Sequence, residues 1–120
     1  MMTETLFFDT YALIEMHEGN PRYARFHDAK IVMNMLNLFE LTHYFIRTGM
    51  DTNSLIMYEG VLSPVEFSDA INGAKTKHEH KKFKLSMADC IGYETARRLG
   101  IKFLTGDKAF KGMKNVEYVA

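Results

Sequence analysis

Four acidic residues stand where their carboxylates could share one reaction: Asp9, Glu40, Asp89 and Asp107. Two of them follow apolar runs typical of buried strands, and the other two lie in segments with helical periodicity. If the four side chains meet in a cleft of low dielectric, their repulsion requires either protonation or a bound cation. Because carboxylate oxygens are hard ligands and no Cys or His stands at a matching place, this set favours Mg²⁺ or Mn²⁺ over Zn²⁺.

A divalent cation held by carboxylates would suit the hydrolysis of phosphodiester bonds. Such an ion makes its bound water more acidic and stabilises the leaving oxygen, so no protein nucleophile is needed. The sequence contains no plausible Ser/His/Asp or Cys/His catalytic set and no glycine-rich phosphate loop. We therefore predict metal-dependent phosphodiester hydrolysis.

Each of the four acids also has a purely local explanation. Asp9 and Asp107 stand where Asp commonly caps a helix or forms a turn. Asp89 lies near the start of a predicted helix, where the helix dipole favours a negative charge. Glu40 could form an ion pair with Arg47 or with a neighbouring chain, or it could belong to a thin strip exposed to solvent. The nuclease hypothesis thus depends on all four side chains reaching one place.

Short apolar runs alternate with helical segments along the chain. The predicted strands cover residues 6–8, 30–33, 60–62, 101–104 and 116–119. The predicted helices cover residues 11–17, 21–26, 35–48, 55–58, 63–80 and 87–99. This alternation predicts an α/β fold of three layers, in which helices flank a central parallel sheet of about five short strands. Sites in such sheets lie at the carboxyl ends of strands, where Asp9 and Asp107 stand.

The predicted helix over residues 35–48 is apolar around most of its circumference, so we expect it to be mostly buried. Its polar members Asn37, Glu40, Tyr44 and Arg47 follow one narrow stripe. In the helix over residues 87–99, Asp89 lies on the shoulder of the apolar stripe, so we expect a half-buried carboxylate that needs a partner.

Composition describes an ordinary globular chain. It has 120 residues with 47% hydrophobic and 25% charged residues, which predicts one domain over residues 1–120. The formal net charge is zero, so any binding to nucleic acid must come from a local patch. The first residues lack the features of a signal peptide or membrane span, and Cys90 is the only cysteine. These features lead us to expect a cytoplasmic protein without a membrane anchor.

Four short motifs, each containing one of the four acids, follow one another along the chain. Residues 7–10 (FFDT) end an opening strand in an Asp-Thr pair, and residues 37–41 (NLFEL) embed a Glu in a helix. Residues 85–91 (LSMADCI) begin a helix with an Asp, and residues 103–110 (FLTGDKAF) form a TxDxxF turn before the closing strand at 116–119. Together these segments resemble the PIN-domain family over nearly the whole chain, and most closely its small VapC-like toxin ribonucleases.

The resemblance implies a PIN-like fold and a metal-dependent endoribonuclease that is the toxin of a toxin-antitoxin pair. It implies a metal-binding acidic pocket made by Asp9, Glu40, Asp89 and Asp107, with the hydroxyls of Thr10 and Thr105 as polar supports. It also implies an RNA substrate, bound Mg²⁺ or Mn²⁺, a homodimer, and an antitoxin that occupies or covers the pocket.

Two positions depart from the family pattern. Ala109 stands where many relatives carry a further acid, so the ligand set lacks a fifth carboxylate for a second metal ion. Tyr11 replaces the small residue that often follows the Asp-Thr pair, and we expect it to narrow the entrance of the pocket or to shape the choice of substrate.

One local basic cluster offers a surface for RNA. It consists of Lys75, Lys77, Lys81, Lys82 and Lys84. Contacts of these side chains with phosphates would release counterions and make binding dependent on salt. The alternative is an ordinary solvated end of a helix, because surfaces rich in lysine are common.

Two other functions are open to the sequence. A catalytically inactive PIN-like fold could serve as a binding scaffold, with the basic cluster or a dimer face as its working surface. A signalling receiver domain also places acids at strand ends, but it requires paired acids after its first strand, whereas Asp9 has Phe8 and Thr10 as neighbours.

Overall fold

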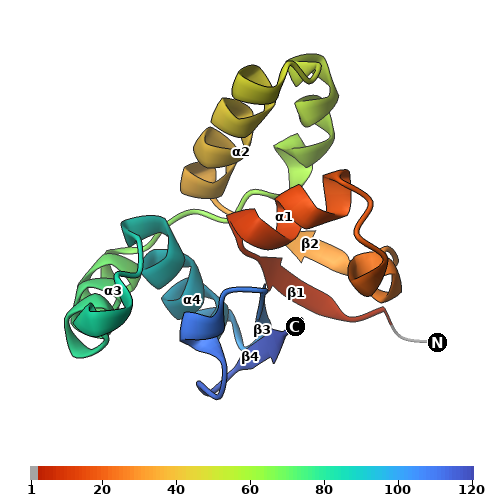
Figure 1. The fold of residues 1–120 in the computed structure, drawn as a ribbon. Coiled ribbons are helices and arrows are strands. Elements are labelled where there is room, and N and C mark those ends of the chain that lie inside the picture. Colours follow the sequence, from red (N-terminus) through yellow and green to blue (C-terminus); the bar gives the residue numbers. More distant parts are fainter. Residues whose placement is uncertain (1–2) are drawn as a thin grey trace.

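A sheet of four parallel strands, in the order β2-β1-β3-β4, forms the centre of the fold (Figure 1). The structure is a computed structural model and describes residues 3–120. The strands are β1 (Thr5–Phe8), β2 (Lys30–Val32), β3 (Lys102–Thr105) and β4 (Val116–Tyr118). The predicted α/β fold with a parallel sheet flanked by helices is confirmed.

The predicted strand over residues 60–62 is wrong, so the sheet has four strands where about five were expected. Residues 60 and 61 complete the 3-10 helix η2 (Thr52–Val61). Only a single parallel bridge, between Leu62 and Met33, joins this segment to the edge of the sheet. Because Gly60 and Val61 belong to the last 3-10 turn, only Leu62 of the three residues remains extended, which is too short for a strand.

Helices form at the places where the sequence offers caps. The α-helices are α1 (Thr10–His17), α2 (Met35–Thr48), α3 (Phe67–Glu79) and α4 (Met87–Leu99). The other short 3-10 helices are η1 (Pro21–Phe26), η3 (Lys81–Phe83) and η4 (Lys108–Phe110). Helix α3 begins later than predicted, because Glu66 rather than Ser63 precedes its first turn. Among residues 3–120, none of the helices has both the length and the apolar character needed to cross a membrane.

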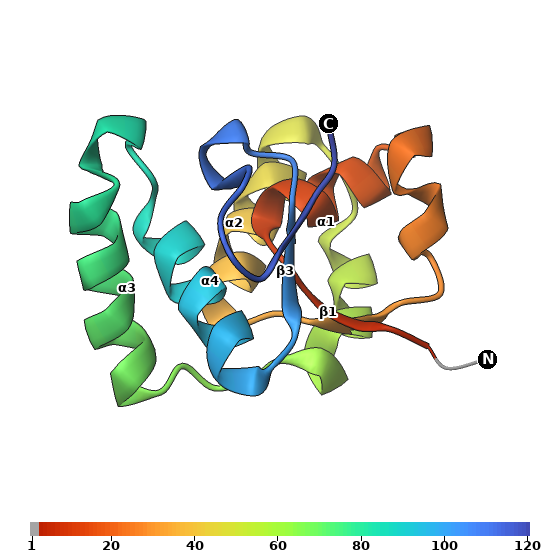
Figure 2. The same ribbon diagram turned by 90° about the horizontal axis from the view of Figure 1, so that it is seen from below.

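The alternating side chains of β1 separate two cores. Leu6 and Phe8 belong to a core with residues of α1 and α2, whereas Phe7 belongs to a second core with residues of α4. Helix α3 packs on α4 and lies outside the three layers (Figure 2). This arrangement directs the N-terminal ends of α1 and α4 towards the same edge of the sheet, where β1 and β3 end.

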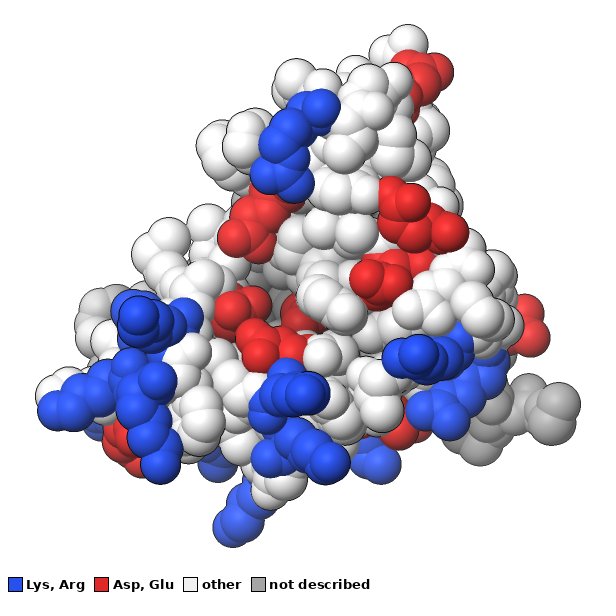
Figure 3. Space-filling view, in the orientation of Figure 1, with Lys and Arg blue, Asp and Glu red and all other residues white. Residues whose placement is uncertain are grey.

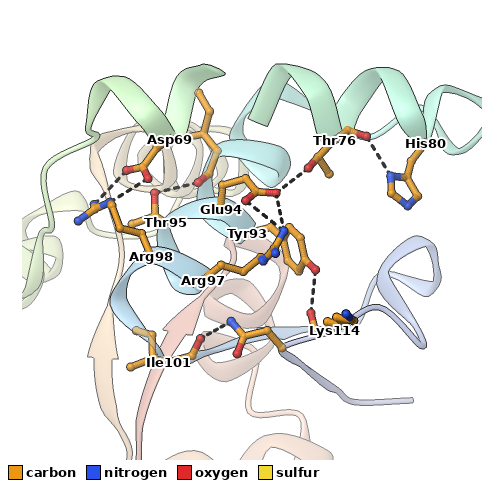
Figure 4. A network of polar contacts seen from close by, with 12 residues as sticks. Asp69, Thr76, His80, Tyr93, Glu94, Thr95, Arg97, Arg98, Ile101 and Lys114 are labelled. Carbon is orange, nitrogen blue, oxygen red and sulfur yellow. Dashed lines mark hydrogen bonds and ion pairs between the residues drawn. The ribbon is translucent and has the colours of Figure 1, made fainter. Parts of the chain in front are cut away.

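A polar network fixes α3 against α4, the helix that carries Asp89 (Figure 4). The Asp69 carboxylate is 1% exposed and accepts hydrogen bonds of 2.9 Å from both Nε and Nη2 of Arg98. Burial works to raise the pKa of Asp69, but the hydrogen bonds from Arg98 hold it below its ordinary value. Farther along the helices, the Thr76 hydroxyl donates to Glu94 Oε2 at 2.6 Å.

We expect Arg98→Met to lower the free energy of unfolding by about 3 kcal/mol, because it leaves the buried Asp69 carboxylate without its cation. The midpoint of thermal unfolding should fall by roughly 10 °C. Arg97→Met is the matched control, since Arg97 is 51% exposed and contacts Glu94 at 3.4 Å. That control should change stability by less than about 1 kcal/mol. Equal effects of the two substitutions would contradict a special role for the Asp69–Arg98 pair.

Candidate active site

All four acids singled out in the sequence line one cavity at the carboxyl edge of the sheet. The cavity has a volume of about 910 Å³. In Figure 3 acidic side chains gather around a hollow at the centre of this face. The elements that supply them are the end of β1, the middle of α2, the start of α4 and the turn after β3. Apart from the acids, its lining includes Thr10, Tyr11, Phe39, His43, Tyr44, Arg47, Ser86, Gly106 and Lys108.

Asp9 is buried where β1 passes into α1. Its backbone N–H donates to the Leu104 carbonyl of β3 at 3.1 Å, so the residue is fixed by the sheet itself. Its Oδ1 atom accepts a hydrogen bond of 2.7 Å from the Ala12 N–H and caps α1. The local explanation of Asp9 as a helix cap is therefore correct, and the same residue also faces the shared cavity.

Asp107 and Asp89 also combine a local cap with a place in the cavity. Oδ1 of Asp107 accepts from the Ala109 N–H at 2.9 Å. Oδ2 of Asp89 accepts from the Ser86 N–H at 3.1 Å, and the Ser86 hydroxyl accepts from the Asp89 N–H at 3.0 Å. Because each of these bonds uses one carboxylate oxygen, the other oxygen can serve a ligand in the cavity.

The electrostatics of the cavity disfavour negative charge. Burial raises the pKa of Asp9 to about 8, and the negative charges of Asp89 and Asp107 contribute to this rise. Hydrogen bonds from Thr105 and Ala12 lower the pKa and oppose this shift in part. Burial also raises the pKa of Asp89, and Asp107 contributes in the same direction. The carboxylates are therefore close enough to repel one another. A bound cation would offset this repulsion and favour their charged forms.

Glu40 reaches the cavity from α2, but the predicted burial of this helix is wrong. Met35, Phe39 and Ile46 are 62%, 76% and 65% exposed, because no other element of the described chain covers that side of α2. The carboxylate of Glu40 accepts a hydrogen bond of 2.5 Å from the Thr10 hydroxyl. Glu40 thus has Thr10 as its partner in place of the ion pair with Arg47 that the sequence left open.

The two threonines occupy different positions. Thr10 lines the cavity beside Asp9. Thr105 is fully buried at the end of β3, and its hydroxyl accepts from the Asp107 N–H at 3.0 Å. A hydrogen bond from Thr105 also lowers the pKa of Asp9. Thr105 therefore connects two of the acids from beneath the cavity and does not line it.

The five lysines of the predicted basic cluster do not form one site. Lys77, Lys81 and Lys84 line a hollow beside the end of α3. Lys75 lines a separate hollow with the Asp69–Arg98 pair, and Lys82 lies over the ring of Phe83. Lys77 donates to the Leu85 carbonyl just before α4, and its charge opposes the rise in the pKa of Asp89. Only part of the cluster therefore lies on the side of the acidic cavity.

Sequence reasoning missed the cations of the cavity. His43, Arg47 and Lys108 line it together with the acids. Arg47 had appeared as a member of a polar stripe and as a possible ion-pair partner of Glu40, and Lys108 only as part of a turn. Arg47 had already been placed on the same stripe as Glu40. The spacing of His43 from Glu40, about one helical turn, was the signal that could have placed His43 on that face as well.

The carboxylates that line the cavity suit a hard divalent cation, but their oxygens do not converge on one point. Carboxylates predominate among the possible ligands of the cavity, and His43 is the only imidazole there. Within residues 3–120, no three carboxylate, imidazole or thiol groups are close enough to form a ready-made metal site. Binding of an ion by three or more of these groups would therefore require their side chains to move closer together.

Comparison with known proteins identifies the fold and the family of the chain. Residues 6–116 match the PIN domain family. A chain of a toxin-antitoxin complex from Klebsiella pneumoniae superimposes with a TM-score of 0.79 and 18% identity, covering 96% of this chain and 98% of that one. The protein PAE2754 from Pyrobaculum aerophilum superimposes with a TM-score of 0.66 and 16% identity, covering 98% and 92%. Comparison with curated protein sequences finds no match. Since the family match extends over most of the chain, the protein belongs to the PIN domain family.

Proposed function

We propose that this chain is a metal-dependent endoribonuclease, in which Asp9, Glu40, Asp89 and Asp107 together hold Mg²⁺ or Mn²⁺. The observation that carries the proposal is the convergence of these four acids on one cavity from distant parts of the sequence. The raised pKa of Asp9, about 8, supports it, because a buried group of carboxylates is costly unless a cation neutralises it. PIN domains are generally nucleases, which agrees with this chemistry.

A bound divalent ion would supply an acidified water and stabilise the negative charge that develops on the phosphate and its leaving oxygen. The chain contributes the remaining parts. The acids orient the ion, and their capping bonds to Ala12, Ala109 and Ser86 keep them in place. Arg47 and Lys108 line the same cavity and are available for contacts with the phosphate oxygens of a bound RNA.

We further propose that the nuclease acts as the toxin of a toxin-antitoxin pair and forms a homodimer. The fold of the Klebsiella pneumoniae chain, taken from a toxin-antitoxin complex, supports a protein partner. An independent observation also supports a protein partner. One side of α2 exposes the large apolar side chains of Met35, Phe39 and Ile46, and such exposed apolar surfaces mark contact sites between proteins. The single domain and the cytoplasmic location stay predictions from the sequence.

Incubation of the purified protein with single-stranded and structured RNAs tests the proposed activity. Cleavage should occur with Mn²⁺ or Mg²⁺ and stop in excess EDTA. Cleavage that persists unchanged in EDTA would contradict the metal-dependent mechanism. Binding of RNA without cleavage under any metal condition would favour the inactive scaffold.

The lysines beside α4 provide a test of how RNA is bound. We expect Lys81→Ala combined with Lys84→Ala to weaken RNA binding and to lower the dependence of affinity on salt, by about two counterions if both contact phosphates. Lys75→Ala is the matched control, because Lys75 lines a different hollow. Binding should be measured by fluorescence anisotropy at several salt concentrations. Equal losses in the control and the double variant would show that general charge, not this surface, controls binding.

A further inference from the structure

A hydrogen-bonded chain leads from Asn37 through Thr10 to Glu40. Asn37 is 1% exposed and lies on α2, one turn before Glu40. Its Oδ1 atom accepts from the Asn34 N–H at 3.0 Å, and its Nδ2 atom donates to the Thr10 hydroxyl at 3.2 Å. A backbone N–H can only donate, so the oxygen of the Asn37 amide must face Asn34 and its NH₂ group must face Thr10.

This orientation determines where the Thr10 proton goes. A hydroxyl has one proton, and the Thr10 oxygen already accepts a hydrogen bond from Asn37. Its proton is therefore directed to Oε1 of Glu40, at 2.5 Å. The orientation of the buried Asn37 amide thus determines the direction of the bonds from Asn37 to Thr10 and from Thr10 to Glu40. The bond from Thr10 holds one carboxylate oxygen of Glu40, while the other oxygen can face the cavity.

We infer that Asn37 is a positioning residue, which fixes the orientation of the Glu40 carboxylate through the hydroxyl of Thr10. Glu40 is the only one of the four acids that does not lie at a strand end or a helix start, and its longer side chain has more rotational freedom to lose. The chain of hydrogen bonds joins α2 to Thr10, the residue next to Asp9. Because these bonds form on folding, the Glu40 side chain loses its rotational freedom then and not when an ion binds. The inference rests on the proposed function, in which Glu40 serves the bound metal.

Asn37→Asp tests the direction of the hydrogen bonds. The new carboxylate keeps an oxygen for the Asn34 N–H and thus preserves the cap of α2, but towards Thr10 it can only accept. The Thr10 proton would then turn from Glu40 to residue 37. We expect at least a tenfold lower affinity for Mn²⁺, measured by isothermal titration calorimetry, and a lower kcat for RNA cleavage at unchanged KM. An added negative charge by itself would raise the affinity for Mn²⁺, so a decrease identifies the hydrogen-bond effect.

Asn37→Ala is the matched comparison. It removes the amide and the hydrogen bond that Asn37 Oδ1 accepts from the Asn34 N–H, whereas the bonds that the Asn34 side chain accepts at the start of α2 remain. Thr10 stays free to donate to Glu40, so the affinity of this variant for Mn²⁺ should exceed that of Asn37→Asp. A merely structural role predicts the opposite order, because only the alanine variant loses the capping oxygen. Affinity in Asn37→Asp equal to or above that of the wild type, or an alanine variant that binds as weakly, would overturn the inference. Thr10→Val removes the hydroxyl at similar volume, adds no charge, and should reproduce the loss if Asn37→Asp does not fold.

A readout without metal separates this inference from the proposed function. In the metal-free protein, NMR relaxation of the Glu40 side chain should show an ordered carboxylate in the wild type and increased motion in Asn37→Asp. If the wild type binds no Mn²⁺ and cleaves no RNA, the proposed function fails. Failure of the positioning role would appear instead as equal order of Glu40 in both proteins.

Discussion

Asp89→Asn is expected to lower the kcat for RNA cleavage by at least about 100-fold while the protein keeps its fold. Loss of a group that only orients a metal ligand costs roughly 10- to 100-fold, so loss of a ligand should cost at least as much. The fold should survive, because the oxygen of Asn can still accept from the Ser86 N–H and complete the cap of α4. Single-turnover cleavage of a labelled RNA in Mn²⁺ measures the effect, and circular dichroism checks the fold.

Asp28→Asn is the matched control for this experiment. Asp28 is an exposed acid that lines a different hollow, together with Glu4 and Arg25. Its substitution should leave the cleavage rate within about twofold of the wild type, because a surface charge outside the cavity has little effect on the reaction. Normal cleavage by Asp89→Asn would remove this residue from the proposed active site.

The stability of the metal-free protein is expected to fall as the pH rises from about 4 to about 8. Asp9 has a pKa of about 8 in the folded protein and an ordinary pKa of 3.8 once unfolded. Between these values the folded state binds more protons than the unfolded state, so raising the pH favours unfolding. The slope should approach about 1.4 kcal/mol per pH unit for one such group. Urea unfolding in EDTA at several pH values measures it.

Asp9→Asn removes the titrating group and should remove most of this slope. Its amide oxygen can still accept from the Ala12 N–H and cap α1. At pH 8 the metal-free variant should be at least about 2 kcal/mol more stable than the wild type, whereas Mn²⁺ should stabilise only the wild type strongly. A wild type whose stability is the same at pH 5 and pH 8 would contradict the buried, repelling carboxylates.

Most of the fold could be predicted where local chemistry decides the structure. Helix α4 begins after Ser86 and ends at Gly100. Helix α2 likewise begins after Asn34 and ends at Gly49. Such capping residues satisfy the free backbone groups at helix ends through contacts within a few residues of sequence. Residues 60–62 were misread as a strand, because a short apolar run does not reveal whether it continues a preceding 3-10 helix.

The exposed side of α2 shows a second limit of sequence reasoning. Apolar periodicity tells which residues avoid water, and the helix over residues 35–48 was therefore expected to be mostly buried, yet it exposes Met35, Phe39 and Ile46. It cannot tell whether the covering surface belongs to the same chain. These side chains are exposed in the single chain, so the expectation that they are buried applies at most to an assembly.

The candidate site was predicted in its acids but not in their connections. Asp9 and Asp107 could be placed because parallel strands end at the same edge of the sheet. The hydrogen bond between Thr10 and Glu40 joins residues that are 30 positions apart, and it exists only because α1 and α2 pack side by side. Asn37 was visible as a member of the polar stripe of this helix, but its role depends on partners from two elements.

Anomalous X-ray diffraction at the manganese edge, from crystals grown with Mn²⁺, tests most directly whether the acids share an ion. We predict a single strong peak in the cavity at the ends of β1 and β3, within bonding distance of oxygens from at least two of Asp9, Glu40, Asp89 and Asp107. A cavity without manganese at saturating concentrations, with ordered carboxylates that remain apart, would contradict the proposed metal-dependent nuclease.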